Sequence, residues 1–380
     1  MIRHAWIVLL FVLVVSGTHD VIAQAGIASL SSLRFLGSYE VPYNQPFKGT
    51  TIGGLSGIDY DSKNDRYFLI SDDRSAIDPA RFYTAKIQLS EKGIDTVVFT
   101  ETRILLSETG LPYPNAKQDR AHTPDPESIR YNAKTNNLVW TSEGERILNQ
   151  KDTVLENPAL TVINPDGKYM GAFQVPHNLL MRKTKSGPRQ NGTLEGLTFA
   201  DDYSTLYVST EEPLFEDGPR ADLLPGKALI RIFQFDVATQ HNVGQYAYAL
   251  ETIAHPAFPP TAFKINGVPE ILSLGNSKLL VVERSFSTGR LPCTVKVFLA
   301  DHSQSTNIMS TRSLQENPPA KLVTKTILLN MDDLGIYIDN IEGVTVGPNL
   351  PNGHNTLLFV SDNNFNAFEV TQLLLFEVIP

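Results

Sequence analysis

Short apolar runs recur along the whole chain, and a few polar residues separate each run from the next. The runs are rich in Val, Ile, Leu, Tyr and Phe, whereas the separating segments are rich in Gly, Pro, Asn and Asp. This pattern is typical of β-strands joined by turns. The clearest turn signals are Asp-Ser-Lys-Asn-Asp at 61–65 and Asn-Pro-Asp-Gly at 164–167. No long stretch has the 3.6-residue period of an amphipathic helix, so we expect an all-β protein.

The predicted strands fall into groups of four. The four complete groups are 55–60, 67–71, 82–89 and 97–106; 128–131, 138–142, 159–163 and 169–175; 196–199, 205–209, 229–237 and 245–252; and 271–274, 278–283, 294–300 and 322–330. A fifth group has only three strands, at 344–347, 356–361 and 372–379, while one extra strand at 33–41 precedes the first group. Four-stranded units arranged radially form a β-propeller. We therefore predict five blades, closed by the N-terminal strand. Six blades remain the alternative if 106–123 or 214–227 contains strands, and two packed sandwiches would not explain the regular spacing.

An acidic residue marks both the opening and the ending of the first two strands in nearly every group. The opening positions are Ser56, Glu127, Glu195, Glu270 and Glu342, which lie 71, 68, 75 and 72 residues apart. The distance from opening to ending is 16 residues in the first three groups, 13 in the fourth and 20 in the fifth. Such a period is the signature of a repeat architecture. Because the second strand of a blade runs antiparallel to the first, both sets of acids are expected at one mouth of the central channel.

Carboxylates gathered in this way repel one another unless a cation, a basic side chain or backbone N–H groups compensate them. Oxygen ligands favour Ca²⁺ or Mg²⁺, and neither cysteine ligands nor paired histidines indicate zinc. We predict a Ca²⁺ site with the candidate ligands Asp72, Asp73, Glu127, Glu195, Glu211, Glu270, Glu342, Asp362 and Asn363. The alternative is that each glutamate accepts N–H groups of the adjacent blade and only holds the blades together.

Three arginines follow the acidic endings closely, namely Arg74, Arg146 and Arg284. An arginine in this position is either an ion-pair partner of the acids or a fork for a substrate phosphate or carboxylate. His122 lies five residues before Glu127 and is a candidate acid or ligand, although a loop histidine is the simpler interpretation. Cys293, the only cysteine, is expected to be a buried residue of a strand and cannot form an intramolecular disulfide.

Composition narrows the class of protein further. The chain has 380 residues, a formal net charge of −9 and 19% charged residues, which fits a globular protein and argues against nucleic-acid binding. Arg3 and His4 precede an apolar run at 5–15, and Ala-Gln-Ala follows at 23–25. These are the features of a signal peptide, and eleven apolar residues are too few for a membrane span. We expect a signal peptide at 1–25 and one exported domain at 26–380, periplasmic or secreted; a retained anchor is the alternative.

Ten short segments of the chain together resemble a known family. They are 55–58 with 71–74, 81–83, 125–128, 194–197, 211–214, 270–271, 282–284, 340–343 and 361–365. In these segments the chain resembles the phytase-like "esterase-like activity of phytase" proteins, which are exported bacterial propellers. It departs from the family pattern at Ser128, where glycine is usual, and at Ser56, where the other blades carry glutamate.

The resemblance implies a propeller and metal-assisted hydrolysis of phosphate esters or other esters, with a small-molecule substrate and a monomeric chain. The leading hypothesis is a Ca²⁺-dependent phosphate-ester hydrolase. Its candidate catalytic residues are Arg74, Glu127, Glu195, Glu212 and Arg284, and its candidate substrate-binding residues are Arg146 and His122. The alternatives are a non-catalytic propeller that binds a ligand or protein with structural calcium, and a calcium esterase or lactonase.

Overall fold

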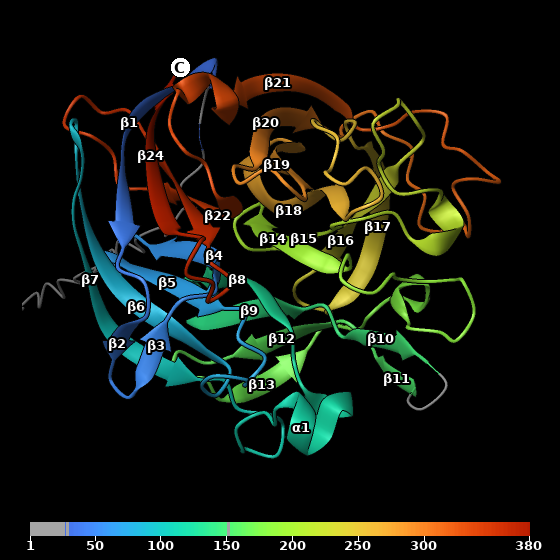
Figure 1. Cartoon of the computed structure of the whole chain (residues 1–380), viewed down its shortest axis with the longest axis horizontal. Helices are drawn as coiled ribbons and strands as arrows, with labels where there is room; N and C mark the ends of the chain where they lie inside the picture. Colours follow the sequence, from blue (N-terminus) through green and yellow to red (C-terminus); the bar gives the residue numbers. More distant parts are fainter. Residues whose placement is uncertain (1–26, 28–29, 150–152) are drawn as a thin grey trace, which may run out of the picture.

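Five antiparallel sheets of four strands surround one axis (Figure 1) in the computed structural model, which describes residues 27, 30–149 and 153–380. Each sheet begins with its innermost strand. The first sheet contains β4 (Leu55–Asp61), β5 (Arg66–Ser71), β6 (Arg81–Ser90) and β7 (Gly93–Ile104); the second contains β8 (Pro126–Asn132), β9 (Asn137–Ser142), β12 (Ala159–Ile163) and β13 (Tyr169–Ala172). The third contains β14 (Leu194–Ala200), β15 (Thr205–Thr210), β16 (Leu229–Asp236) and β17 (His241–Ala249). The fourth contains β18 (Lys264–Gly275), β19 (Lys278–Ser287), β20 (Thr294–Asp301) and β21 (Thr324–Asn330).

The fifth sheet combines the two ends of the described chain. Its strands are β22 (Asn340–Gly347), β23 (Thr356–Asp362), β24 (Thr371–Ile379) and, outermost, β1 (Ser32–Val41). β1 pairs antiparallel with β24, from Ser32 opposite Ile379 to Val41 opposite Thr371. The all-β propeller with five four-stranded blades is thus confirmed. Six blades are not supported, because the fully described connections 106–123 and 214–227 contain only α1 (Ala116–Asp119), η1 (Arg120–His122), η3 (Phe215–Asp217) and one isolated bridge.

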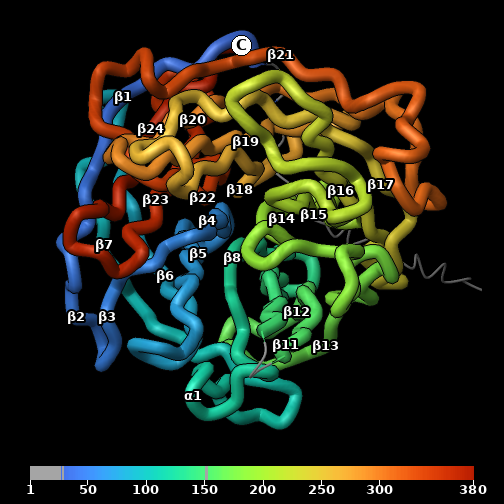
Figure 2. Tube along the Cα trace, turned by 45° about the vertical axis from the view of Figure 1, so that its right-hand side comes forward, coloured from blue at the N-terminus to red at the C-terminus, as the bar shows by residue number. Residues whose placement is uncertain are grey.

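Elements outside the blades were not predicted from the sequence. Two short hairpins, β2 (Gln45–Phe47) with β3 (Thr50–Ile52) and β10 (Glu145–Leu148) with β11 (Thr153–Glu156), leave the ring, as do η2 (His177–Leu179) and η4 (Met331–Leu334). Figure 2 shows α1 projecting from the ring beside the second sheet. No helix among the described residues is both long and apolar enough to cross a membrane. The predicted signal peptide lies outside the described residues.

Apolar side chains fill the space between every pair of neighbouring sheets, which holds the blades together. Phe68 and Trp140 pack between the first and second sheets, and Val295 and Phe359 pack between the fourth and fifth. Three further buried clusters fill the remaining interfaces. Each fully buried large apolar side chain contributes about 1.5–3 kcal/mol. The core is therefore distributed around the ring, and the axis is left to polar groups.

A single arginine occupies the axis. Arg130 of β8 is buried and donates Nε to Leu197 O (2.6 Å), Nη2 to Val344 O (3.0 Å) and Nη1 to Ile58 O. A longer bond from Nη2 reaches Ile271 O at 3.3 Å. These carbonyls belong to the innermost strands of the four other sheets, so one side chain touches all five blades. Arg130 closes the channel between a small hollow at one end and a large cavity at the other.

Candidate active site

The large cavity has a volume of about 1180 Å³ and lies at the end of the channel where the acidic openings and endings meet. Six acids of the openings and endings line it together with Asp125, which makes seven carboxylates: Asp72, Asp125, Glu127, Glu143, Glu195, Glu211 and Glu342. They follow or begin strands of four different sheets. The predicted convergence of acids on one mouth of the channel therefore matches the geometry, for these residues.

A β-bulge positions the opening acids. The pairing register shifts at the opening of every innermost strand, for example between Pro126 and Ile129 in β8 and between Leu194 and Leu197 in β14. At a β-bulge, two residues of one strand lie opposite one residue of the partner strand. The bulge therefore changes the direction of a side chain that would otherwise follow the alternation between the two faces of the sheet. The bulged residues include Glu127 and Glu195, whose side chains line the cavity.

The glycine that follows the opening acid has a packing role. A Cβ on Gly196 would lie 2.7 Å from the backbone N of Ile271, and one on Gly57 would lie 2.8 Å from Glu127 O. Because no real Cβ approaches backbone so closely, glycine lets adjacent innermost strands come together. Ser128 takes this place in the second blade, and its hydroxyl donates to Glu270 Oε2 at 3.0 Å. The departure from the family pattern thus has a structural explanation.

Three carboxylates form the tightest group. Asp125, Glu127 and Glu143 each offer an oxygen within 4.8 Å of the others. Glu143 Oε1 accepts the N–H groups of Gly192 (2.6 Å) and Thr193 (2.5 Å), which fixes its orientation. No described residue donates a hydrogen bond to the Glu127 carboxylate or forms an ion pair with it, and the same holds for Asp72 and Glu195. Three carboxylates at this spacing, of which Glu127 has no partner among the described residues, fit a hard divalent cation.

Burial and crowding change the protonation of these acids. Burial, followed by repulsion from Glu195 and the other neighbouring carboxylates, raises the pKa of Glu127 well above its usual value. Burial and the neighbouring carboxylates raise the pKa of Glu143 to about 8. The pKa of Asp125 rises only to about 6, because Arg74 opposes the effect of burial. A bound cation would compensate the charge that the protein itself leaves unpaired.

Arg284 is the one cation held deep in the cavity wall. Its Nη2 donates to Glu211 Oε1 at 2.6 Å, and its Nη1 donates to Glu342 Oε1 at 2.8 Å. These carboxylates raise the pKa of Arg284 although burial opposes the charge. Cys293 also lines the cavity, and burial raises the pKa of its thiol to about 12. The thiol is buried, as its sequence context predicts, but Cys293 lies directly before β20 and not within a strand.

Four of the predicted metal ligands do not line the cavity. Asp73 accepts N–H groups of a turn, from Ala76, Ile77 and Asp78, and pairs with Arg81 at 2.7 Å. Asn363 Oδ1 accepts the N–H groups of Gly54 and Phe365. Asp362 is buried outside the cavity lining. Its Oδ1 accepts a hydrogen bond from the N–H of Asn364, and its Oδ2 has no hydrogen-bond partner among the described residues.

Glu270 is the clearest case in which an opening acid joins blades. Its Oε2 pairs with Arg130 Nη2 at 2.8 Å, and its Oε1 accepts the N–H of Leu197 at 2.9 Å. It lies fully buried on the axis, outside the cavity lining. Because these partners occupy both of its oxygens, Glu270 fits the alternative interpretation of a residue that holds the blades together.

The remaining candidates also lie outside the lining. Glu212 is buried and pairs with Arg220, and Arg74 pairs with Asp125 (3.4 Å) and Glu145 (3.3 Å) behind the cluster. Arg146 donates Nε to Arg182 O at 3.0 Å and so orders a loop. His122 is exposed, and its Nδ1 lies 2.8 Å from Asp119 Oδ2. Neither Arg146 nor His122 reaches the cavity, so the structure gives no support to their substrate-binding roles.

Sequence reasoning did not select two acids of the tightest group or the apolar rim. Asp125 lies two residues before Glu127, and Glu143 is an acidic ending, so both carried a signal that the repeat contained. The rim side chains Phe263, Leu291 and Phe368 also line the cavity and are 56%, 71% and 82% exposed. They come from connections between strands, where the repeat pattern does not apply.

Fold and site together define a five-bladed propeller with a carboxylate-lined cavity on its axis. The model of the phytase-like family, described as esterase-like activity of phytase, matches residues 50–365. The chain belongs to this family. No curated protein matches the sequence.

Several solved structures resemble the chain at low sequence identity. An endo-arabinase from Bacteroides thetaiotaomicron is 11% identical, with 90% of this chain and 98% of that chain covered and a TM-score of 0.44. The arabinanase Arb43A from Bacillus subtilis is also 11% identical, with 90% and 96% covered and a TM-score of 0.42. A GH43 β-1,3-galactosidase is 12% identical, with 88% and 93% covered and a TM-score of 0.47. No activity is transferred from these likenesses.

Proposed function

We propose that the protein is an exported, Ca²⁺-dependent hydrolase of phosphate esters that works in the axial cavity. The observation that carries this proposal is the group of Asp125, Glu127 and Glu143, whose oxygens lie within 4.8 Å of one another. The unpaired carboxylates of Asp72 and Glu195 line the same cavity. These five side chains would hold the cation, and a bound Ca²⁺ supplies Lewis-acid polarisation of a substrate oxygen.

Residues of the protein itself would orient a ligand of the cation, balance the charge of the acids and bind the substrate anion. Gly192 and Thr193 hold Glu143 in place through their N–H groups, so one ligand is oriented in advance. Arg74 stays behind the cluster and balances Asp125 and Glu145. Arg284 is committed to Glu211 and Glu342, and it therefore keeps the wall together. Arg290 lines the cavity without an ion pair among the described residues and is the arginine placed to meet a substrate anion.

The charge of the lining sets the class of ester. Nine acidic residues line the cavity, namely the seven carboxylates above with Asp339 and Glu369, against three arginines, Arg220, Arg284 and Arg290. No lysine lines it. A polyanion such as phytate would be repelled by this excess of negative charge, whereas a monoester with one phosphate needs only the cation and Arg290. The rim of Phe263, Leu291 and Phe368 favours a leaving group with an apolar or aromatic part.

The same rim favours a second candidate, a calcium esterase or lactonase. A carboxylic ester brings no negative charge into an acidic cavity and would contact the apolar side chains directly. The lining therefore suits an uncharged ester as well as a phosphate monoester. A propeller that only binds its ligand, with calcium in a structural role, is the outcome if neither ester is turned over.

Turnover with and without metal tests the proposal. The purified protein would be assayed on 4-nitrophenyl phosphate, phytate and 4-nitrophenyl acetate, with added Ca²⁺ and after EDTA treatment. We expect Ca²⁺-dependent turnover of the aryl phosphate, little on phytate, and loss of about 10²-fold or more with Glu127→Gln. Glu91→Gln, an exposed acid on a turn, serves as the matched control. Turnover of the acetate alone would select the esterase, and binding of Ca²⁺ without any turnover would refute a hydrolase.

A further inference from the structure

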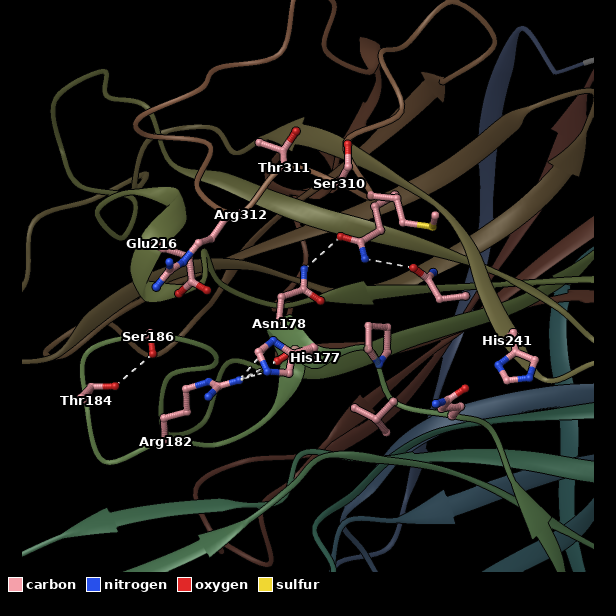
Figure 3. A pocket seen from close by; sticks show the side chains of 16 residues that line it. His177, Asn178, Arg182, Thr184, Ser186, Glu216, His241, Ser310, Thr311 and Arg312 are labelled. Atoms are coloured by element: carbon pink, nitrogen blue, oxygen red, sulfur yellow. Dashed lines mark hydrogen bonds between the residues drawn. The ribbon is translucent and has the colours of Figure 1, made fainter.

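A second cavity of about 800 Å³ lies away from the axis and shares no lining residue with the acidic one (Figure 3). Its walls come from three blades. The lining residues lie on the connection 173–193 between β13 and β14, on the beginning of β17, on the connection 302–323 between β20 and β21, and at Glu216 of η3. Its volume falls within the range of small-molecule sites, which is roughly 300–1,000 Å³.

The two connections are far longer than the topology requires. They contain 21 and 22 residues, counted from the strand bounds, and β20 and β21 are adjacent antiparallel strands that a turn of about 2–5 residues would join. Long connections in a compact domain are usually functional. Both converge on this cavity, which indicates that it is a built feature of the molecule and not a gap between loops.

A buried ion pair beneath the cavity fixes its walls. Asp217 accepts from Arg231 twice, from Nε at 2.6 Å and from Nη2 at 2.7 Å, and both side chains are fully buried. Arg231 Nη2 also donates to Thr311 O at 3.0 Å, and the N–H of Leu314 donates to Asp217 Oδ1 at 3.0 Å. Because a buried pair contributes little net stability, its role here is to set one arrangement of three segments.

The floor of the cavity is a chain of oriented amides. Gln245 is buried, and its Oε1 accepts from Arg231 Nη1 at 2.9 Å and from Asn178 Nδ2 at 3.0 Å. Its Nε2 donates to Asn242 Oδ1 at 2.9 Å. The fixed direction of these bonds leaves Asn178 Oδ1 without a donor among the described residues. An oriented carbonyl of this kind accepts a hydrogen bond from a hydroxyl group.

The charge of this cavity is opposite to that of the axial one. Arg182 and Arg312 line it together with one acid, Glu216, whose Oε2 accepts the N–H of Gly187 at 2.6 Å. Arg182 Nη2 donates to His177 Nε2 at 2.9 Å and to His177 O at 3.2 Å, which holds the guanidinium and leaves its other nitrogens free. Figure 3 shows Arg182 and Arg312 on the same side of the cavity.

We propose that this cavity binds a sugar-sized organic anion that carries hydroxyl groups. The anionic group would lie between Arg182 and Arg312, because two guanidinium groups exceed one carboxylate there. The hydroxyl groups would reach Asn178 and the side chains of Thr184 and Ser310, which line the same cavity. A sugar carboxylate and a sugar phosphate share this chemistry, and this inference does not rest on the proposed hydrolase activity.

Calorimetric titration of the full protein tests the proposal, with D-glucuronate, glucose 6-phosphate, glucose and inorganic phosphate as probes. We expect at least one of the two anionic sugars to bind more tightly than glucose and than phosphate alone. The double variant Arg182→Gln/Arg312→Gln should weaken that binding by about tenfold or more. Arg103→Gln, an exposed arginine that lines neither cavity, is the matched control and should leave it unchanged.

Three outcomes would overturn the proposal. The first is no detectable binding of either anionic sugar up to about 10 mM. The second is equal binding of glucose, which would show that the arginines contribute nothing. The third is binding that the double variant preserves at full strength, because the ligand would then occupy another site, such as the axial cavity.

Discussion

Arg284 donates Nη2 to Glu211 Oε1 at 2.6 Å, and this bond joins β19 of the fourth blade to the end of β15 in the third. Its Nη1 reaches Glu342 in the fifth blade at 2.8 Å. One guanidinium thus holds an acidic ending and an acidic opening from two different blades. Among the acids that the repeat brings together, Glu211 and Glu342 are therefore paired with arginine, whereas Asp72, Glu127 and Glu195 have no such partner among the described residues.

Replacement of Arg284 by glutamine is expected to lower the free energy of unfolding by about 3–5 kcal/mol, because two buried carboxylates lose their charged partner. Urea denaturation measures this change. Arg103→Gln, which removes an exposed pair with Glu101, should cost about 0–1 kcal/mol. A similar effect of the two substitutions would contradict the role given to Arg284.

The axial pair of Arg130 and Glu270 gives a second prediction. Arg130→Met leaves buried carbonyls of four strands without a donor and should destabilise the fold by about 3–5 kcal/mol. Glu270→Gln keeps an acceptor for Leu197 N–H and should cost less. The double variant is then expected to be more stable than the sum of the single effects implies, as a double-mutant cycle would show. Strict additivity would mean that the pair does not act as a unit.

The raised pKa values predict how pH acts on the metal-free protein. The pKa of Glu143 is about 8 in the folded chain and lies near 4.5 when unfolded, so the folded state binds this proton more tightly. Its contribution to stability is full below about 4.5 and is lost as pH rises through about 8. After EDTA treatment, the melting temperature should therefore fall between pH 5 and 8.

Added Ca²⁺ should raise the melting temperature more at pH 8 than at pH 5, because the ligands must lose their protons to bind it. Glu143→Gln removes a titrating group and should flatten the metal-free profile. If the melting temperature in EDTA rose with pH instead, the prediction would be contradicted. That result would show that these carboxylates are ionised and that their charge is compensated without a metal ion.

The N-terminal strand gives a fourth prediction. Phe35 of β1 packs on Phe376 of β24 with ring centroids 5.3 Å apart, and β1 covers the outer edge of that strand. We expect a chain that begins at residue 42 to expose this edge, melt at a lower temperature and associate, as light scattering would detect. Glu40→Ala, an exposed position on β1, should change stability by less than about 0.5 kcal/mol. A monomeric truncated chain with an unchanged melting temperature would contradict it.

The sequence predicted the strands and the convergence of acids because both depend on local patterns. Alternation and turn residues place each strand, and the repeat of about 70 residues places equivalent acids at equivalent depths. Glu127, Glu195 and Glu342 therefore line the cavity, as we expect for openings. Bulges and the glycines beside them extend the same local signal.

The fate of each acid could not be predicted, because it depends on partners from distant segments. Glu270 and Glu195 occupy equivalent opening positions. Glu270 nevertheless forms an ion pair with Arg130, which lies 140 residues earlier in the sequence. Asp73 is adjacent to Asp72 in the sequence, but its carboxylate pairs with Arg81 and accepts hydrogen bonds from its own loop. Connections such as 302–323 have no hydrophobic or repeat periodicity. The apolar rim and the second cavity therefore could not be predicted from the sequence.

The position of Arg130 affects how a ligand can enter and leave the axial cavity. Because this side chain extends from β8 and bonds to the innermost strands of the other four blades, it blocks the axis, and we infer that the axial cavity opens at one end only. A ligand must enter and leave by the same opening, so each molecule has to depart before the next can occupy the floor. A long polymer cannot thread through the ring and can present only a chain end. The cavity is therefore suited to small molecules or to terminal groups, taken one at a time.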